Sequence, residues 1–179
     1  MNSLIIYGSQ YGTTERYAKR FSEIVHLPAV TYESVNDLTQ YNQIVYFGAL
    51  YAGGIKGLRQ IIKILPNSVK LIIVTVGLAD VHDRENINNI RRAMEKQAPE
   101  NIMKYADIFH LRGGIDYQKL SFRHKTMMTL LYHKAKGIPE EKKTAEVNAM
   151  IETFNSKVDF VDYASLAPIV EAFQRNLDF

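Results

Sequence analysis

The chain has 179 residues, of which 46% are hydrophobic and 23% are charged, values typical of one globular domain with a sizeable core. It contains no cysteine, which excludes a disulfide scaffold, a thiolate nucleophile, iron–sulfur ligation and any cysteine-based zinc site. The net charge is +3, but eight Lys or Arg against three acidic residues between Arg112 and Lys143 give that segment +5 and leave −2 for the rest.

Short apolar runs alternate with helical patterns along the chain. Strand-like runs occupy residues 4–7, 29–32, 43–48, 70–76 and 108–111, and helical patterns occupy residues 14–25, 56–65, 84–97, 122–135 and 163–176. Continuous apolar strands that alternate with helices are typical of a parallel sheet covered on both faces. The sequence therefore predicts an α/β fold with a doubly wound, five-stranded parallel sheet and helices on both faces. We expect residues 1–179 to form a single domain, with a basic helical insertion at about 112–143 before the last helix.

The N-terminal residues give no sign of export. Met1 leads directly into the first predicted strand, without the basic region and cleavage site of a signal peptide. No apolar run approaches the roughly 20 residues that cross a bilayer as a helix. We therefore expect a cytoplasmic location and no nucleic-acid partner. The sequence does not indicate an oligomeric state.

The turn after the first predicted strand is rich in Gly, Ser and Thr and leads directly into a helix. In open α/β sheets, anionic ligands bind beyond the carboxyl end of a strand, where a helix N-terminus offers unpaired N–H groups. The turn contains no Lys or Arg, which favours a monophosphate held by neutral donors without a metal. The residues predicted to surround this phosphate are Ser9, Gln10, Tyr11, Gly12, Thr13 and Thr14.

Two other phosphate motifs are excluded by their spacing. A triphosphate-binding loop needs a second Gly five residues after the first, but Thr13 stands five residues after Gly8 and no Lys follows. A dinucleotide-binding turn needs Gly at the second position after its first Gly, where this chain has Gln10. A structural alternative stays open, in which Gly12 and Thr13 merely turn the chain and Thr14 caps the helix.

The segment Ser-Gln-Tyr-Gly-Thr-Thr at residues 9–14 resembles the FMN phosphate loop of flavodoxins, which reads Ser or Thr, any residue, Thr or Tyr, Gly, any residue, Thr. The order of predicted elements is similar to that family over nearly the whole chain. The resemblance implies a flavodoxin-like sheet of order 2-1-3-4-5, with FMN bound non-covalently where the order reverses. It also implies that the turns after strands three and four hold the flavin ring.

After the third predicted strand, Tyr51 is the residue implied to stack on the flavin, and a flexible turn with a half-exposed Tyr51 is the alternative. The turn after the fourth strand would offer backbone groups to the pyrimidine edge, although Asp80 can equally be an ordinary helix-start residue. This second turn lacks the aromatic residue found there in many flavodoxins. The candidates in the two turns are Ala49, Leu50, Tyr51, Ala52, Gly53 and Gly54, and Thr75, Gly77, Leu78, Ala79 and Asp80.

The predicted helix at 122–135 is rich in cations and methionine. A cationic amphipathic helix lies on anionic lipid, takes up an anionic ligand, or packs on the domain with its cations in water. The segment at 111–120, Leu-Arg-Gly-Gly-Ile-Asp-Tyr-Gln-Lys-Leu, followed by this helix, resembles the insertion of menaquinone-dependent protoporphyrinogen oxidases. The apolar residues are Phe122, Met127, Met128, Leu130, Leu131 and Tyr132, and the polar side carries Arg123, Lys125, His133, Lys134 and Lys136.

We expect a redox protein that transfers electrons through its bound FMN, with a redox protein or a quinone as partner. The alternative is a protoporphyrinogen oxidase-type oxidoreductase of heme biosynthesis that passes electrons to a quinone at the inner face of the membrane. The cationic segment favours the alternative, because shuttles that dock on basic reductases present acidic surfaces. The intact phosphate loop disfavours a cofactor-free binding module. We predict no catalytic residue, and the histidines show no metal-ligand spacing.

Overall fold

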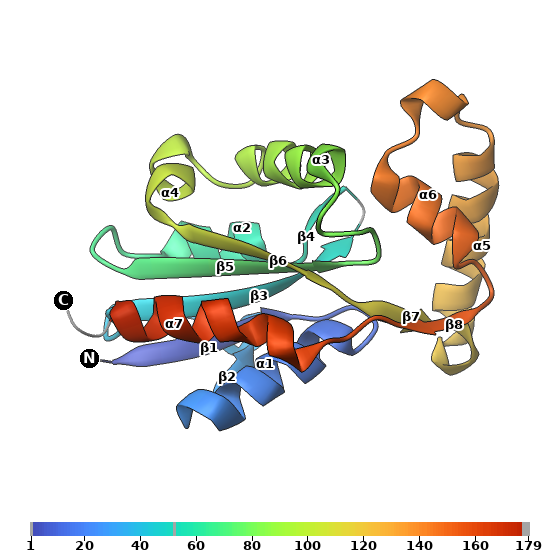
Figure 1. The fold of residues 1–179 in the computed structure, drawn as a ribbon. Coiled ribbons are helices and arrows are strands. Elements are labelled where there is room, and N and C mark those ends of the chain that lie inside the picture. The colour runs from blue at the N-terminus through green and yellow to red at the C-terminus, as the bar shows by residue number, and fades with distance from the viewer. Residues whose placement is uncertain (1, 52, 177–179) are drawn as a thin grey trace.

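A computed structural model describes residues 2–51 and 53–176. Within these residues the central sheet contains five parallel strands in the spatial order β2-β1-β3-β5-β6 (Figure 1). This order confirms the predicted doubly wound sheet, in which the direction of winding reverses between β1 and β3. The strands are β1 (Ser3–Gly8), β2 (Ala29–Thr31), β3 (Gln43–Tyr51), β5 (Lys70–Gly77) and β6 (Asp107–Arg112).

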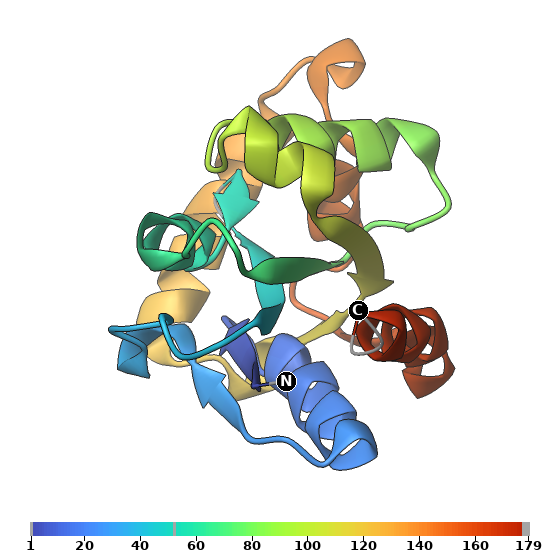
Figure 2. The same cartoon turned by 90° about the vertical axis from the view of Figure 1, so that its left-hand side faces the viewer.

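Helices cover both faces of this sheet, as the sequence predicts (Figure 1 and Figure 2). One face carries α1 (Thr13–Val25) and α7 (Ala167–Arg175). The other carries α2 (Leu58–Ile64), α3 (Arg84–Glu95) and α4 (Glu100–Tyr105). The 3-10 turn η1 (Tyr32–Ser34) follows β2, and the 3-10 turn η4 (Tyr163–Leu166) precedes α7.

The two layers of core follow from the alternation of side chains along each strand. Ile5 and Val45 point to the side of α1 and α7, whereas Ile6 and Ile44 point to the side of α2 and α3. All four side chains are fully buried. Because both faces of the central strands are covered, these strands read as continuous apolar runs in the sequence.

Strand β3 is longer than predicted. It runs to Tyr51 and pairs antiparallel with the short strand β4 (Gly54–Ile55), so that Tyr51 lies opposite Gly54. Gly53 has a φ of 76°, a left-handed conformation that favours glycine. The turn implied to contact the flavin ring is therefore a β-hairpin. Its predicted residue Ala52 lies outside the described residues.

Two helical segments differ from the prediction. The sequence predicts one helix at 163–176, whereas the chain forms η4 and then α7, with Pro168 in the first turn of α7. Proline has no N–H to donate and is favoured where a new helix begins. Helix α4 is not predicted, because its six residues are too few for a recognisable apolar period. It begins directly after Pro99.

The residues between β6 and α7 form what we call the insertion unit (residues 114–159). Its strands pair antiparallel with each other, and inside it the ring of Tyr132 stacks on Phe154 at a centroid distance of 3.9 Å. The unit lies beyond the carboxyl ends of the parallel strands (Figure 1). Its elements are β7 (Gly114–Asp116), η2 (Tyr117–Lys119), α5 (Phe122–Lys136), η3 (Glu140–Lys142), α6 (Ala145–Glu152) and β8 (Lys157–Asp159).

Of these elements the sequence predicts α5 alone, and the single apolar side assigned to that helix is wrong. Met128 is buried, whereas Phe122 is 85% exposed and Leu130 is 67% exposed. Apolar side chains therefore lie on opposite sides of α5. The strands β7 and β8 have three residues each, too few to show an alternating pattern. Among the residues described, we find no helix with the length and apolarity needed to cross a bilayer.

Candidate functional site

The predicted phosphate loop lies between β1 and α1, at the carboxyl edge of the sheet. Gly12 has a φ of 92° and turns the chain into α1, and its N–H donates to Oγ of Ser9 at 3.1 Å. In the described part of the chain no side chain caps α1, whereas Asp83, Ser121 and Thr144 cap α3, α5 and α6. The first N–H groups of α1 therefore lack side-chain partners, and this donor set fits a phosphate.

Thr13 and Thr14 occupy the first turn of α1. Thr14 is buried and Thr13 is half-buried. Because Gly12 is the N-cap residue, the alternative in which Thr14 caps the helix is wrong. The backbone N–H groups of both threonines belong to the unpaired set at the helix N-terminus.

A lysine that the sequence does not single out lies against this loop. The Nζ atom of Lys56 donates to the carbonyl oxygen of Ser9 and to Oε1 of Gln10, both at 2.8 Å. The carbonyl oxygen of Lys56 accepts a hydrogen bond from the hydroxyl of Tyr46, and a Cβ on Gly8 would collide with the same oxygen. The expectation of a phosphate site without a cation is therefore corrected, because Lys56 brings one from the segment between β4 and α2.

Two tyrosines connect the predicted phosphate loop and the β3–β4 hairpin to the insertion unit. The rings of Tyr11 and Tyr51 meet edge to face, with 6.4 Å between centroids. Their hydroxyl groups contact methionine sulfur atoms of α5, Tyr11 with Met128 at 3.2 Å and Tyr51 with Met127 at 2.8 Å. Burial raises the pKa of Tyr11, so its hydroxyl stays protonated and can donate. Tyr51, the predicted stacking residue, thus stands between the phosphate loop and α5.

Helix α5 also reaches the phosphate loop through His124. Its Nε2 atom lies 3.1 Å from Nε2 of Gln10, and its Nδ1 atom lies 3.0 Å from Oγ of Ser121, the N-cap residue of α5. The phosphate loop, the β3–β4 hairpin and the basic helix are far apart in the sequence, yet they meet at this point.

The turn after β5 is bonded to α6. The backbone N–H groups of Leu78 and Ala79 donate to the two carboxylate oxygens of Glu146, at 3.1 and 3.0 Å. The carbonyl oxygen of Leu78 accepts from Nε of Arg112 at 2.9 Å. Two of the N–H groups expected to face the pyrimidine edge of the flavin are therefore paired with Glu146. A Cβ on Gly77 would lie 3.1 Å from the same carboxylate.

Thr75 and Asp80, also predicted to contact the ring, make hydrogen bonds within the scaffold. The hydroxyl of Thr75 is buried and lies 2.7 Å from Nδ1 of His110. The carboxylate of Asp80 accepts from the N–H of His82 at 2.9 Å, and its carbonyl oxygen accepts from Nδ2 of Asn86 at 2.8 Å. Asp80 thus stabilises the turn that enters α3, as in the helix-start alternative.

His110 is a partly buried histidine on β6. Burial lowers the pKa of His110 to about 4, with a smaller contribution from the positive charge of Arg91. Its Nε2 atom has no hydrogen-bond partner among the residues that the structure describes. The imidazole is therefore neutral at physiological pH, and its bond to Thr75 gives it a structural role.

A cavity of about 680 Å³ opens between the predicted flavin loops (the phosphate loop and the turns after β3 and β5), α3 and the insertion unit. Its volume falls in the range of roughly 300–1,000 Å³ that is typical of small-molecule sites. The wall formed by α3, α5 and α6 is largely apolar, with Ile90, Met128, Leu131, Val147 and Met150. The predicted flavin-contact residues at its border are Tyr11, Leu50, Tyr51, Gly53, Gly54 and Leu78.

A few polar groups interrupt this apolar wall. Arg92, Lys96 and Lys134 line the cavity and carry positive charge, whereas the carboxylate of Glu146, which also lines it, is paired with the β5 turn. Asn89 also lines it, and the Nδ2 atom of Asn89 is buried without a partner in the described part of the chain. A buried donor without a partner costs about 1–3 kcal/mol. The cavity is thus suited to an apolar molecule that carries hydrogen-bond acceptors or negative charges.

Comparison with known proteins places these observations in a family. A family model described as a flavodoxin domain matches residues 4–142. Two similar solved structures are cysteine mutants of flavodoxin from Pseudomonas aeruginosa. The alanine mutant is 17% identical over 76% of this chain and 97% of that chain, with a TM-score of 0.39. The serine mutant is 16% identical over 63% of this chain and 84% of that chain, with a TM-score of 0.40.

The comparison with curated proteins gave no match. The family match nevertheless covers most of the chain, from the first residues of β1 to the end of η3. Flavodoxins transfer electrons through FMN that they bind non-covalently, and the uncapped N-terminus of α1 behind Ser9 and Gly12 suits the phosphate of that cofactor. This chain therefore belongs to the flavodoxin domain family and binds FMN without a covalent bond.

Proposed function

We propose that the chain is an FMN oxidoreductase that exchanges electrons with a small molecule in the cavity, rather than with a protein at an open flavin edge. The observation that carries this proposal is the position of the insertion unit across the flavin loops. Helix α5 contacts Tyr11 and Tyr51, and α6 contacts Leu78 and Ala79. A protein partner needs direct access to the flavin, whereas a small molecule can enter the space that these helices border.

The lining of the cavity favours an apolar molecule with carboxylate groups. Arg92, Lys96 and Lys134 can pair with carboxylates, and Asn89 offers an N–H donor. Protoporphyrinogen, an apolar macrocycle with carboxylates, belongs to this class. The resemblance of residues 111–120 to protoporphyrinogen oxidases supports it as the first substrate to test. A quinone at the membrane is then the acceptor of the electrons.

Bound FMN supplies one- and two-electron chemistry. In each proposed oxidation step the substrate loses two electrons and two protons, and a quinone takes up two electrons and two protons and becomes a quinol. The residues of the chain bind and orient the substrate through the apolar wall and the three cations. Helices α5 and α6 reduce the access of bulk water to the flavin loops.

An anaerobic reduction assay tests this proposal. The FMN-loaded protein is mixed with protoporphyrinogen or, separately, with a flavodoxin reductase and its nicotinamide donor, and the loss of flavin absorbance is followed. We expect fast bleaching by protoporphyrinogen. Bleaching by the reductase alone would contradict the proposal and favour an electron shuttle with a protein partner.

A pair of variants tests whether the substrate occupies this cavity. Ala93 lines the cavity on α3, and Asn88 is an exposed residue of the same helix. Ala93→Phe should slow bleaching by protoporphyrinogen about tenfold or more, because the added ring takes up space that the substrate needs. Asn88→Phe adds the same ring outside the cavity and should bleach at the wild-type rate. Equal rates for the two variants would place the substrate elsewhere.

A further inference from the structure

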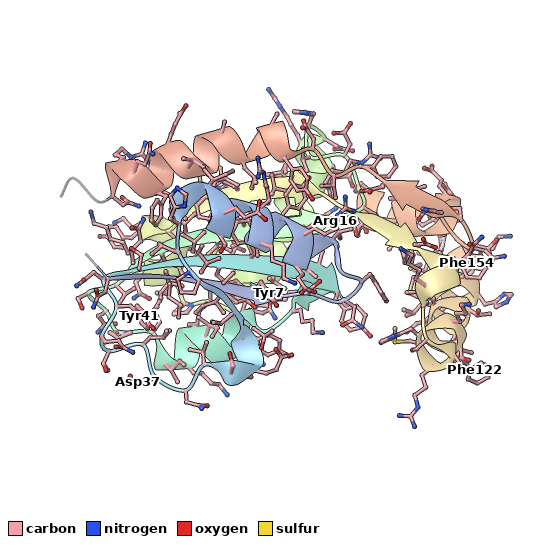
Figure 3. The ribbon with its side chains drawn as sticks, turned by 90° about the horizontal axis from the view of Figure 1, so that it is seen from below. Tyr7, Arg16, Asp37, Tyr41, Phe122 and Phe154 are labelled. Carbon is pink, nitrogen blue, oxygen red and sulfur yellow. The ribbon has the colours of Figure 1, made fainter. Side chains whose placement is uncertain are left out.

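Helix α5 exposes two large apolar side chains, Phe122 and Leu130, on the side that faces away from the cavity. Phe122, Thr126, Leu130 and His133 are spaced three or four residues apart and therefore share one face, which we call the outer strip. Phe122 is 85% exposed and Leu130 is 67% exposed. Figure 3 shows Phe122 at the outer edge of the insertion unit, away from the sheet.

Cations flank the outer strip along both of its sides. Helical geometry places Arg123 and Lys134 on one side and Lys125 and Lys136 on the other, and all four residues are exposed. Helix α5 contains no Asp or Glu, so nothing within the helix offsets their charge. The insertion unit thus presents exposed apolar side chains between two rows of positive charge.

From this arrangement we infer that the outer strip docks the protein on an anionic lipid surface. Helices that lie in the plane of a membrane bury apolar side chains at the boundary between head groups and acyl chains, and their cations attract anionic head groups. A soluble polyanion such as a nucleic acid would pair with the cations alone. The exposure of Phe122 and Leu130 between those cations therefore favours lipid as the partner.

The opposite side of the same helix lines the cavity through Met128, Leu131 and Ala135. Docking on the outer strip would therefore bring the cavity within about one helix diameter, roughly 10 Å, of the lipid. An apolar molecule dissolved in the membrane would have a short path to the cavity. The docking itself depends on the outer strip and its cations, and it holds whichever molecule the cavity binds.

Vesicle co-sedimentation of the full FMN-loaded chain tests this inference. The vesicles contain either phosphatidylcholine alone or phosphatidylcholine mixed with phosphatidylglycerol. We expect binding to the anionic vesicles, weaker binding to the neutral ones, and loss of binding as salt is raised. Equal binding to both vesicle types, or no binding to either, would overturn the inference.

Two double variants separate the apolar and the charged parts of the surface. Phe122→Ser with Leu130→Ser should weaken binding to anionic vesicles about tenfold or more, since both side chains lose their burial in lipid. Arg123→Gln with Lys136→Gln should weaken it about 30-fold, since each cation near an anionic surface contributes about fivefold. All four positions are exposed, so the variants should fold, as FMN retention and circular dichroism can check.

Control variants remove an exposed aromatic side chain and two exposed cations elsewhere on the surface. Tyr105→Ser removes a side chain that is 78% exposed on α4, and Lys63→Gln with Arg84→Gln removes two exposed cations from α2 and α3. The apolar control should bind anionic vesicles like the wild type, and the charge control should lose far less affinity than the variant of α5. If Phe122→Ser with Leu130→Ser bound anionic vesicles as tightly as the wild type does, the inference would be overturned. The cations would then form a site for soluble anions.

Discussion

Lys56 places a positive charge against a loop whose own sequence has none. Its Nζ atom is held between the carbonyl oxygen of Ser9 and the side chain of Gln10, so the charge is fixed close to the N-terminus of α1. A fixed cation and a set of unpaired N–H groups attract the same ligand. We therefore propose that the phosphate of FMN binds here, with affinity from the loop and from a cation that a distant part of the chain supplies.

Lys56→Gln should weaken FMN binding about tenfold or more, because a hydrogen bond to a charged group contributes about 1.5–3 kcal/mol. Quenching of flavin fluorescence measures the affinity. Riboflavin lacks the phosphate and serves as the control ligand, with Lys63→Gln as the control variant. If Lys56 acts on the phosphate, FMN binding falls more than riboflavin binding. An equal loss for both ligands would show that Lys56 supports only the shape of the loop.

His110 predicts a dependence of stability on pH. Burial lowers its folded-state pKa to about 4 from an unfolded value of 6.5, so the unfolded chain binds more protons between these two values. Its contribution to stability is therefore complete above pH 6.5 and is lost as the pH falls toward about 4, by about 3 kcal/mol at most. Urea unfolding at a series of pH values measures this loss. His110→Asn should show a shallower decline below pH 6.5, and an unchanged slope would assign the decline to other groups.

At the scale of secondary-structure elements, the contact between α6 and the β5 turn has the largest consequence. One carboxylate, that of Glu146, holds two adjacent backbone N–H groups of the turn. Through this side chain α6 is fastened to the sheet at the edge where the predicted flavin loops lie. The order of the β5 turn is therefore coupled to the insertion unit.

Glu146→Gln should loosen this contact, because an amide can accept through one oxygen only and must place its NH₂ group against a donor. Hydrogen exchange of the α6 amides and of Leu78 and Ala79 should become about tenfold faster. Glu152→Gln changes an exposed carboxylate of the same helix and should leave exchange unchanged. Wild-type protection in the Glu146 variant would mean that other contacts hold α6 in place.

The elements that the sequence predicts are those whose pattern is local. The strands around Val45 and Ile72 are apolar runs because the sheet buries both of their faces, and the phosphate loop at residues 9–14 is contiguous. Lys56, Glu146 and Asn89 belong to the site through tertiary packing alone, and no spacing marks them. The buried face of α5 could not be predicted for another reason. Apolar side chains lie on two sides of this helix, so its sequence shows no single apolar stripe at the helical period.

In the molecule as a whole, the basic segment from Arg112 to Lys143 and the rest of the chain occupy different parts of the structure. The segment with a net charge of +5 lies at the carboxyl edge of the sheet as α5 and its neighbours, and the rest of the chain, with −2, forms most of the layered scaffold. The charge of the molecule is therefore distributed unevenly along the direction of its strands, with the basic end at their carboxyl ends. A polarised molecule approaches an anionic surface with its basic end first.

The pairing of β7 with β8 has a consequence for how such a protein can change over time. Gly114 lies opposite Asp159, so the first and last residues of the insertion unit are neighbours, and the N–H of Phe160 donates to the carbonyl oxygen of Gly113 at 3.1 Å. The chain therefore enters and leaves the insertion unit at one place, next to the end of β6. The length and sequence of the insertion unit can therefore change without a change in the path of β6 or α7. Proteins that keep the same cofactor could in this way acquire new substrates by changes in the insertion unit alone.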